Sequence, residues 1–319
     1  MEDKSNFTTV PITGGLGNQL FQLSAGISCA LQANTELRLE TSLGSPRKSE
    51  NGRVELLDLM FDRKLFQSST THLNLVPRKL FNYLLSEGLR SGEVGESNMF
   101  RFAKNVSGKF LSVTEKSKAE IFTSNNLGYV EIDNKKNLFL IGYFQSYRYF
   151  EVPRVKDIMQ SAFTMGEYSL EEIFQLAEID QPLVVHVRRG DYRNEKKFGL
   201  LSADYYNSAI EWQMNKFSYG RIWLFSDEIE FAKTLIPRKY QLQVRVIAPN
   251  KVSSARTLEV MKKGKGFVLA NSSFGYWAAQ LSGVSGSRIM APSPWFRDIV
   301  EPRDLINPEW ERIDAAWED

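Results

Sequence analysis

An apolar run that ends in charged side chains constrains this chain more than any other stretch. Residues 182–187 read Pro-Leu-Val-Val-His-Val, and Arg188, Arg189, Gly190 and Asp191 follow directly. A short β-branched run of this kind is typical of a strand that is buried on both faces, as in a parallel sheet. Open α/β sheets bind their ligands at the carboxyl ends of the strands, so the paired arginines indicate a site for an anion such as a diphosphate.

The two arginines are expected to have different roles. Side chains alternate across a strand, so a strand that continued through Arg189 would place His186 and Arg188 on one face and Arg189 on the other. We therefore expect Arg188 to meet the ligand and Arg189 to anchor the loop. The alternative is a structural clasp, in which Asp191 neutralises both guanidinium groups.

Composition limits the classes of protein to which the chain can belong. With 319 residues, of which 42% are hydrophobic and 24% charged, it can form two domains of ordinary size or one large one. The 40 basic and 38 acidic side chains leave a net charge of +2, so no global field predicts a nucleic-acid partner. No stretch is apolar over the roughly 20 residues of an integral membrane segment, and no signal peptide is visible at the start. A cytoplasmic protein is expected.

Metal chemistry has little support in the sequence. Cys29 is the single cysteine, and His72 and His186 are the two histidines. No Asp-x-Asp sequence occurs in the chain, so the usual carboxylate pair that holds a divalent cation against a sugar-nucleotide diphosphate is absent. We expect no metal, and the leaving-group charge of any diphosphate would fall to an arginine and to helix-start hydroxyls.

The N-terminal region predicts a strand, a glycine-rich turn and a helix. The strand covers residues 10–12, the turn 13–18 and the helix 19–32, and a second strand, 35–40, ends in Glu40. The apolar residues that would share one helix face are Leu20, Leu23, Ile27, Ala30 and Leu31. Backbone N–H groups converge at such a helix start and can cradle a phosphate. A dinucleotide-binding fold would use the same order, with Glu40 on the ribose, although Leu20 occupies the place of its third glycine.

Strands and helices alternate more regularly in the C-terminal half. Residues 41–137 predict only short helices and loops, and 138–141 predict a buried strand. A helix at 169–179 marks a boundary between domains 1–168 and 169–319. The elements predicted after the strand at 182–187 are helices at 203–212, 228–235 and 273–281, and strands at 222–227, 243–247 and 266–270. This alternation predicts a parallel sheet.

Three of these strand ends carry polar side chains that a parallel sheet would bring to one edge. They are His186 with Arg188, Ser226 with Asp227, and the run from Asn271 to Phe274, which includes Ser272 and Ser273. Serines before an apolar helix can bind a phosphate or simply cap the helix. A strand-end aspartate can accept hydrogen bonds from a guanine edge or a ribose, or cap the next helix.

Six motifs together resemble the α1,2-fucosyltransferase family. They occur in family order between residue 12 and about residue 298. The motifs are Gly14-Gly-Leu-Gly-Asn-Gln-Leu-Phe-Gln22, Gly142-Tyr-Phe-Gln-Ser146, His186-Val-Arg-Arg-Gly-Asp-Tyr192, Phe225-Ser-Asp227, Asn271-Ser-Ser-Phe274 and Ala291-Pro-Ser-Pro-Trp-Phe296. The first and third are the most specific.

This resemblance implies an α/β fold of two Rossmann-like domains that face a cleft, the B type of glycosyltransferase. It further implies a galactoside α1,2-fucosyltransferase that moves L-fucose from GDP-β-L-fucose to the 2-hydroxyl of a galactose-containing glycan. The reaction would invert the sugar's configuration without metal or cofactor, in polysaccharide biosynthesis. Acceptor specificity would lie in residues 41–137.

The resemblance also implies roles for individual residues. Arg188 would contact the β-phosphate and fucose, His186 and Asp227 the guanosine, and Ser272, Ser273 and Phe274 the diphosphate region. Gly15, Gly17 and Asn18 would contact the donor sugar. The chain departs from the family at Gly275-Tyr276, where a bulky pair such as Ser-Trp is usual, and this leaves the positioning of the helix start open.

Three points stay open at the level of sequence. Asp191 and Glu195 are the acidic side chains nearest to the arginines that could accept the acceptor's proton, but Asp191 can instead orient Arg188 or Arg189. The glycine turn and Glu40 leave a dinucleotide-dependent oxidoreductase as an alternative. A sugar-binding module without catalysis is the third possibility.

Overall fold

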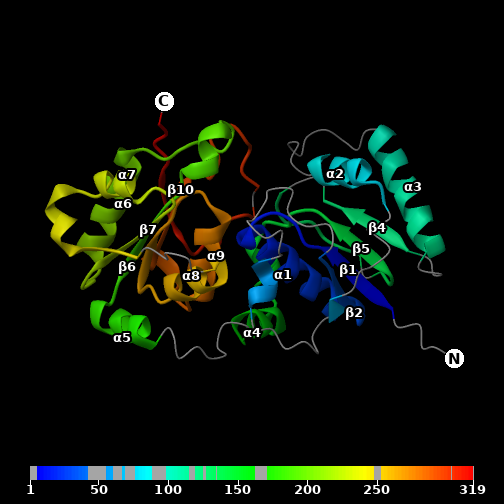
Figure 1. The fold of residues 1–319 in the computed structure, drawn as a ribbon, viewed down its shortest axis with the longest axis horizontal. Coiled ribbons are helices and arrows are strands. Elements are labelled where there is room, and N and C mark those ends of the chain that lie inside the picture. Colours follow the sequence, from blue (N-terminus) through cyan, green and yellow to red (C-terminus); the bar gives the residue numbers. More distant parts are fainter. Residues whose placement is uncertain are drawn as a thin grey trace. The chain divides into compact units, whose positions relative to one another are not determined.

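The chain forms two compact α/β units, which confirms the predicted class (Figure 1). The computed structural model describes residues 6–41, 55–59, 67–68, 76–87, 98–114, 119–124, 127–133, 135–161, 171–247, 253–302 and 304–318. The first unit comprises Met1–Thr164 and Pro302–Ile306, and the second comprises Met165–Glu301 and Asn307–Asp319. The predicted domains, 1–168 and 169–319, assign Pro302–Ile306 to the second domain, whereas these residues belong to the first compact unit. That segment is held by the Tyr147 N–H, which donates to the Asp304 carbonyl at 3.3 Å.

The first unit is built on a parallel sheet of strand order β3-β2-β1-β5-β4. Its strands are β1 (Phe7–Pro11), β2 (Glu36–Glu40), β3 (Gln67–Ser68), β4 (Glu120–Thr123) and β5 (Leu138–Ile141). β1 begins three residues before the predicted strand because Thr8 and Thr9 are fully buried despite their hydroxyls. The Thr8 hydroxyl is satisfied by the Thr35 hydroxyl at 2.6 Å, and β-branched threonines favour strands.

Helix α1 (Leu16–Ala33) packs against β1 and β2 and is buried around most of its circumference. The prediction of a single apolar face is therefore too narrow, and it is wrong for Leu31, which is 44% exposed. Gly26 allows the close approach, since a Cβ there would lie 2.6 Å from Val10 Cγ2. The helix begins at Leu16 rather than Gln19, so Gly17 and Asn18 belong to its first turn and not to the preceding loop.

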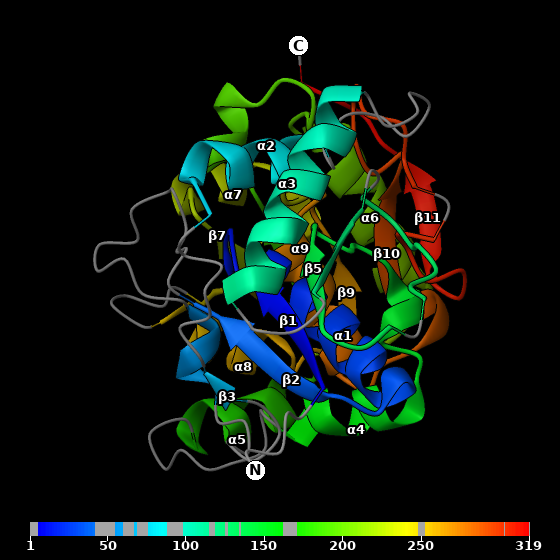
Figure 2. The same ribbon diagram turned by 90° about the vertical axis from the view of Figure 1, so that its right-hand side faces the viewer.

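The region between β2 and β5 contains more regular structure than predicted. The described elements there are η1 (Glu55–Asp58), β3, α2 (Arg78–Glu87), α3 (Asn98–Thr114) and β4. The expectation of only short helices and loops is wrong for α3, which has 17 residues, and for β4. α2 and α3 lie side by side (Figure 2), and the rings of Tyr83 and Phe100 are 6.3 Å apart.

The second unit is built on a parallel sheet of strand order β11-β10-β9-β6-β7-β8. The strands are β6 (Leu183–Val187), β7 (Ile222–Ser226), β8 (Val244–Val246), β9 (Gly266–Val268), β10 (Ile289–Ser293) and β11 (Glu311–Asp314). β6, β7, β8 and β9 confirm predicted strands. β10 and β11 were not predicted, because Pro292 interrupts one run and alternating charges make up the other.

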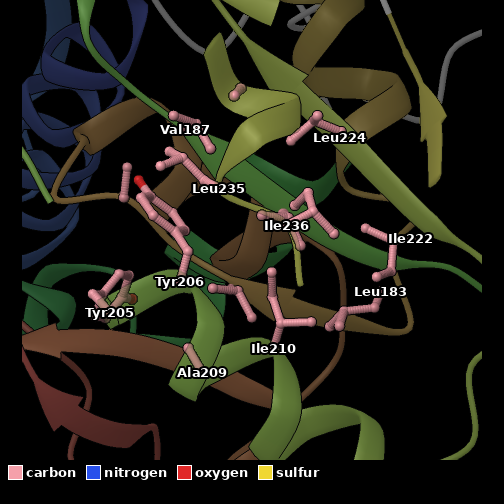
Figure 3. Close-up of a cluster of buried hydrophobic side chains, with 14 of the residues drawn as sticks. Leu183, Val187, Tyr205, Tyr206, Ala209, Ile210, Ile222, Leu224, Leu235 and Ile236 are labelled. Atoms are coloured by element: carbon pink, nitrogen blue, oxygen red, sulfur yellow. The ribbon is translucent and has the colours of Figure 1, made fainter. Parts of the chain in front are cut away.

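Helices connect the strands of the second unit and cover its sheet. They are α5 (Glu171–Asp180), α6 (Ala203–Lys216), α7 (Ile229–Thr234), α8 (Ser254–Met261) and α9 (Ser273–Leu281); α4 (Pro153–Ser161) belongs to the first unit. Figure 3 shows Tyr206 and Ile210 of α6 in one apolar cluster with Leu183, Val187 and Leu224 of the strands. This cluster fixes β6 and β7 as adjacent central strands. No described helix of either unit is long and apolar enough to cross a membrane.

Candidate active site

The structure places the three polar strand ends on neighbouring strands, as predicted. β6 pairs in parallel with β7 on one side and with β9 on the other. Val187 is opposite Ser226, and Val185 is opposite Val268. The chain that follows β6, β7 and β9 therefore leaves the sheet at one edge, where open α/β sheets bind ligands.

β6 ends at Val187, so the alternation rule does not extend to the two arginines. Arg189 has φ −135° and ψ −64° and is followed by the short helix η5 (Gly190–Asn194). The premise that the strand runs through Arg189 is thus wrong. The two guanidinium groups nevertheless separate, because the turn sends Arg189 into the protein and leaves Arg188 half-exposed.

Arg189 is buried among carboxylates and an aromatic ring. Its side chain is 8% exposed and forms ion pairs with Glu228 and Glu318. Its guanidinium carbon lies 3.6 Å from the centre of the Phe231 ring. A guanidinium held in this way is engaged within the protein, as an anchoring residue would be.

Arg188 lies between two carboxylates and keeps access to solvent. Its Nε and Nη2 donate to Asp191 Oδ1 at 3.1 and 2.7 Å, and its Nη1 lies 3.0 Å from Asp227 Oδ2. The side chain is 35% exposed. A guanidinium has five N–H donors in a fixed fork, so these contacts orient it while part of the fork remains for a ligand.

Asp227 holds the end of β6 rather than capping the helix that follows it. Its Oδ1 accepts a hydrogen bond from the Arg189 backbone N–H at 3.0 Å. A Cβ at Gly190 would lie 2.7 Å from Oδ2, so the absence of a side chain at that position lets the carboxylate approach. The N-cap of α7 is Glu228, whose N–H donates to the Ser226 hydroxyl at 2.9 Å. The guanosine role of Asp227 stays a prediction.

His186 is buried against the start of α9. Its ring centre lies 6.1 Å from that of Phe274, and a Cβ at Gly275 would lie 2.4 Å from Nδ1. Nδ1 finds no hydrogen-bond partner among the described residues. Burial, with the positive charge of Arg188 as a second cause, lowers the pKa of His186 to about 3, so the imidazole is neutral at physiological pH. The absence of a side chain at Gly275 thus makes room for this ring.

The start of α9 is tied to the loop that follows β6. Ser272 is the N-cap, and its hydroxyl accepts from the Phe274 N–H at 3.4 Å, so it caps the helix. The Asn271 side chain donates to the Phe198 carbonyl at 2.8 Å, and the Tyr192 hydroxyl donates to the Asn271 carbonyl at 3.1 Å. Ser273 follows as the first helical residue. A phosphate role for these serines would add to the cap that the structure shows.

The glycine turn of the first unit is organised by a carboxylate. Gly14 has φ +78°, Gly15 is the exposed N-cap of α1, and the Leu16 N–H donates to Glu55 Oε2 at 3.0 Å. A carboxylate of the protein itself thus occupies this amide of the possible phosphate cradle. Asn18 Oδ1 accepts from Gln145 Nε2 at 2.8 Å. Donor-sugar contacts of Gly15, Gly17 and Asn18 stay predictions.

Three residues that position the glycine turn before α1 were not predicted from the sequence. Gln19 and Gln22 are buried in α1 and bind the loop: Gln19 donates to the Gly14 carbonyl at 2.7 Å, and Gln22 accepts from the Thr13 N–H at 2.9 Å. Glutamines inside an otherwise apolar helix are a visible signal for such a role. Glu55 lies 39 residues from its partner Leu16, and no local pattern marks such a pairing.

The acidic candidates near the arginines differ in their surroundings. Asp191 is held by hydrogen bonds from Arg188. Glu195 is half-buried at the end of η5, where its backbone N–H donates to the Tyr192 carbonyl at 3.0 Å. Their catalytic roles stay predictions. In the part of the chain that the structure describes, no cluster of three or more His, Cys, Asp and Glu side chains could hold a metal ion.

Comparison with known families assigns the chain. The model of glycosyl transferase family 11 matches residues 7–314, which span both parallel sheets and the polar edge of the second. The chain belongs to glycosyl transferase family 11. It is therefore a glycosyltransferase, and the oxidoreductase and the non-catalytic module are set aside. Glu40, on which the oxidoreductase alternative depended, is fully buried.

Similarity to other proteins extends over most of this family 11 chain. An α-1,2-colitosyltransferase of Escherichia coli is 27% identical over 95% of this chain and 97% of its own. An O-antigen biosynthesis glycosyltransferase, WbnK, also from Escherichia coli, is 25% identical over 89% and 93%. A galactoside 2-α-L-fucosyltransferase, SEC1, of Bos taurus is 28% identical over 41% of this chain and 38% of its own.

Gly275→Ala should disturb the contact between β6 and α9. The new Cβ would lie 2.4 Å from His186 Nδ1, so the ring or the helix start has to move. We expect the free energy of unfolding to fall by about 1–3 kcal/mol in urea denaturation. Gly108→Ala in α3 is the matched control, because the nearest atom to its Cβ is 3.9 Å away. Equal stability of the two variants would contradict the packing described here.

His186 should make the protein less stable as the pH falls. The pKa of His186 is about 3 in the folded chain and 6.5 for an ordinary histidine. Below pH 6.5 the unfolded chain therefore binds a proton at this residue while the folded chain does not, and this favours unfolding. Between pH 6.5 and pH 5 the free energy of unfolding of the wild type should fall by up to about 2 kcal/mol more than that of His186→Gln, because each pH unit contributes at most about 1.4 kcal/mol. Urea denaturation across this range measures the difference. Parallel pH curves for the two proteins would refute it.

Glu318→Ala should loosen the anchor at Arg189. One of the two carboxylates that face a guanidinium of 8% side-chain exposure is removed, while Glu228 remains. Glu318 is itself 26% exposed, so screening reduces the effect, and we expect a loss of about 1–2 kcal/mol in thermal or urea denaturation. The exposed Glu309→Ala serves as the control, with an expected change within about 0.5 kcal/mol. A loss no larger than that of the control would rule the anchor out.

Proposed function

We propose that this family 11 glycosyltransferase moves L-fucose from GDP-β-L-fucose to the 2-hydroxyl of a galactose-containing glycan, with inversion and without a metal ion. The observation that carries the proposal is Arg188. It stands half-exposed at the end of β6, oriented by Asp191 and Asp227, while its neighbour Arg189 is engaged by carboxylates inside the protein. Two relatives support the linkage by their names, the α-1,2-colitosyltransferase of E. coli and the bovine galactoside 2-α-L-fucosyltransferase.

The charges of the reaction explain what Arg188 would do. As the bond from the sugar to GDP lengthens, negative charge grows on the diphosphate. A preoriented guanidinium stabilises this charge through N–H groups that need not reorganise during the reaction. The carboxylates of Asp191 and Asp227 supply that orientation, and Ser272 and Ser273 at the start of α9 would add hydroxyl and helix-dipole contacts.

The structure favours an orienting role for Asp191 within this mechanism. One of its oxygens already accepts two hydrogen bonds from Arg188. Deprotonation of the attacking hydroxyl then falls to Glu195 or to no protein group. His186, neutral because of its burial, would be suited to contact the uncharged guanosine.

A second donor has a specific observation in its favour. The relative that shares 27% of its residues over 95% of this chain is named a colitosyltransferase. Colitose is L-fucose without its 3-hydroxyl, so a site for one sugar resembles a site for the other. The name of WbnK supports a place in polysaccharide assembly, and we place the activity in the cytoplasm.

Direct assay tests both donors. The protein is incubated with GDP-fucose or GDP-colitose and a panel of galactosides, in EDTA and in Mg²⁺ or Mn²⁺, and the product linkage is determined by NMR. We expect an α1,2 product from GDP-fucose at equal rates in EDTA and metal. Transfer only with metal, a different linkage, or transfer from GDP-colitose alone would each overturn the corresponding part of the proposal.

Arg188→Ala should lower kcat by at least about 100-fold, because removing one preorganised donor to a developing charge costs about 3 kcal/mol or more. Arg188→Lys keeps the charge but loses the fork and should recover only part of the rate. Arg193→Ala is the control, since Arg193 follows in the same loop and is 53% exposed. Near-normal turnover by a folded Arg188→Ala enzyme would reject the assignment.

A further inference from the structure

Helix α3 carries a continuous stripe of exposed apolar side chains. Its members and their exposed fractions are Met99 67%, Phe102 69%, Val106 43%, Phe110 41% and Val113 77%. They recur at intervals of three or four residues, so all of them lie along one side of the helix. Exposed apolar residues that occur singly are ordinary, but a contiguous stripe of this length marks a surface that binds something.

The stripe is distinct from the face by which α3 joins its own unit. That inner face consists of Phe100, Ala103 and Leu111, which are buried in the core cluster with Phe139 of β5, and of Ser107. The exposed stripe lies beside it around the helix. The apolar sector of α3 is thus wider than the packing within the first unit requires, and the excess lies at the surface.

The charges of α3 identify the kind of partner. All ionisable side chains between Asn98 and Thr114 are basic, namely Arg101, Lys104 and Lys109. Arg101 and Lys109 are exposed, and Lys109 lies beside Phe102 around the helix. A helix with an apolar side that includes phenylalanines, and with only basic charge on its polar side, fits the interface of a bilayer that contains anionic lipids.

A second copy of the chain fits this surface less well. Pairing two α3 helices through the stripe would place Lys109 of each copy at the edge of the interface, and the repulsion between these like charges would oppose association. Anionic headgroups instead neutralise the charge of Lys109 while the acyl boundary accepts the ring of Phe102, which is 69% exposed.

We propose that α3 docks this enzyme on the surface of an anionic lipid bilayer. The helix lies in the plane of the interface, with the stripe buried among the lipids and with Lys109, at the edge of the stripe, at the level of the headgroups. The proposal concerns a surface of the first unit and does not depend on which sugar or acceptor the enzyme uses.

Vesicle flotation tests the proposal with the 319-residue chain. Vesicles of phosphatidylcholine are compared with vesicles that contain phosphatidylglycerol, at low and high salt. We expect wild type to float with the anionic vesicles and to bind neutral vesicles at least about tenfold more weakly, with binding reduced by salt. Failure to bind anionic vesicles at low salt would overturn the proposal.

Paired variants separate the stripe from general stickiness. Phe102→Asp/Val113→Asp should reduce binding to anionic vesicles at least about tenfold. The matched control, Leu242→Asp, alters a residue that is 93% exposed in the second unit and should bind as wild type does. Lys109→Glu should also weaken binding, whereas Arg238→Glu, exposed in the second unit, should not.

Thermal denaturation and sedimentation complete the test. All five changed positions are exposed, so the variants should unfold within a few degrees of wild type. Equal vesicle binding by Phe102→Asp/Val113→Asp and Leu242→Asp would refute the docking surface. A concentration-dependent dimer that the stripe variant abolishes, without any vesicle binding by wild type, would instead assign the surface to a second copy of the chain.

Discussion

The carboxylate of Asp227 connects the ends of two adjacent strands, and the rest of the polar edge depends on it. One oxygen accepts the Arg189 backbone N–H, and the other lies 3.0 Å from the Arg188 guanidinium. This single side chain therefore holds the backbone at the end of β6 and, together with Asp191, orients the Arg188 guanidinium. A carboxylate that receives a backbone N–H and a guanidinium is strongly held, since charge-assisted hydrogen bonds are about twice as strong as neutral ones.

The starts of α1 and α9 have a similar position in the fold but differ in how the positive end of the helix dipole is compensated. Both helices follow a strand and a turn of small residues. At α1 the Leu16 N–H is occupied by the Glu55 carboxylate, so the helix dipole is already compensated within the protein. At α9 the cap is the uncharged Ser272, which leaves the positive end of the dipole without an anion from its own cap. On electrostatic grounds the start of α9 is therefore better suited than the start of α1 to an additional anion.

Much of the fold follows from sequence pattern, because the central strands β6, β7 and β9 are short apolar runs with turns between them. The prediction failed where tertiary contacts decide the structure. The predicted first strand is shorter than β1, because threonines are polar in sequence even where they are buried in the fold. β11 was not predicted, because an edge strand need not be apolar. The arginines were separated by a turn and not by the pleat of a strand. Glu55 and Glu318 could not be found from sequence, since each reaches its partner across a long stretch of chain.

The anchor of Arg189 has a consequence for the order in which the second unit folds. Its partner Glu318 is 129 residues away along the chain, and the sheet strands β7 to β11 lie between them. Contacts of such long sequence separation cost loop entropy and form only once the intervening elements have docked. The final position of the Arg189 side chain thus depends on the C-terminal end of the unit. Pairing of β6 with β7 alone would therefore leave Arg189 without its Glu318 partner, so the polar edge is complete only when the residues after β11 have also docked.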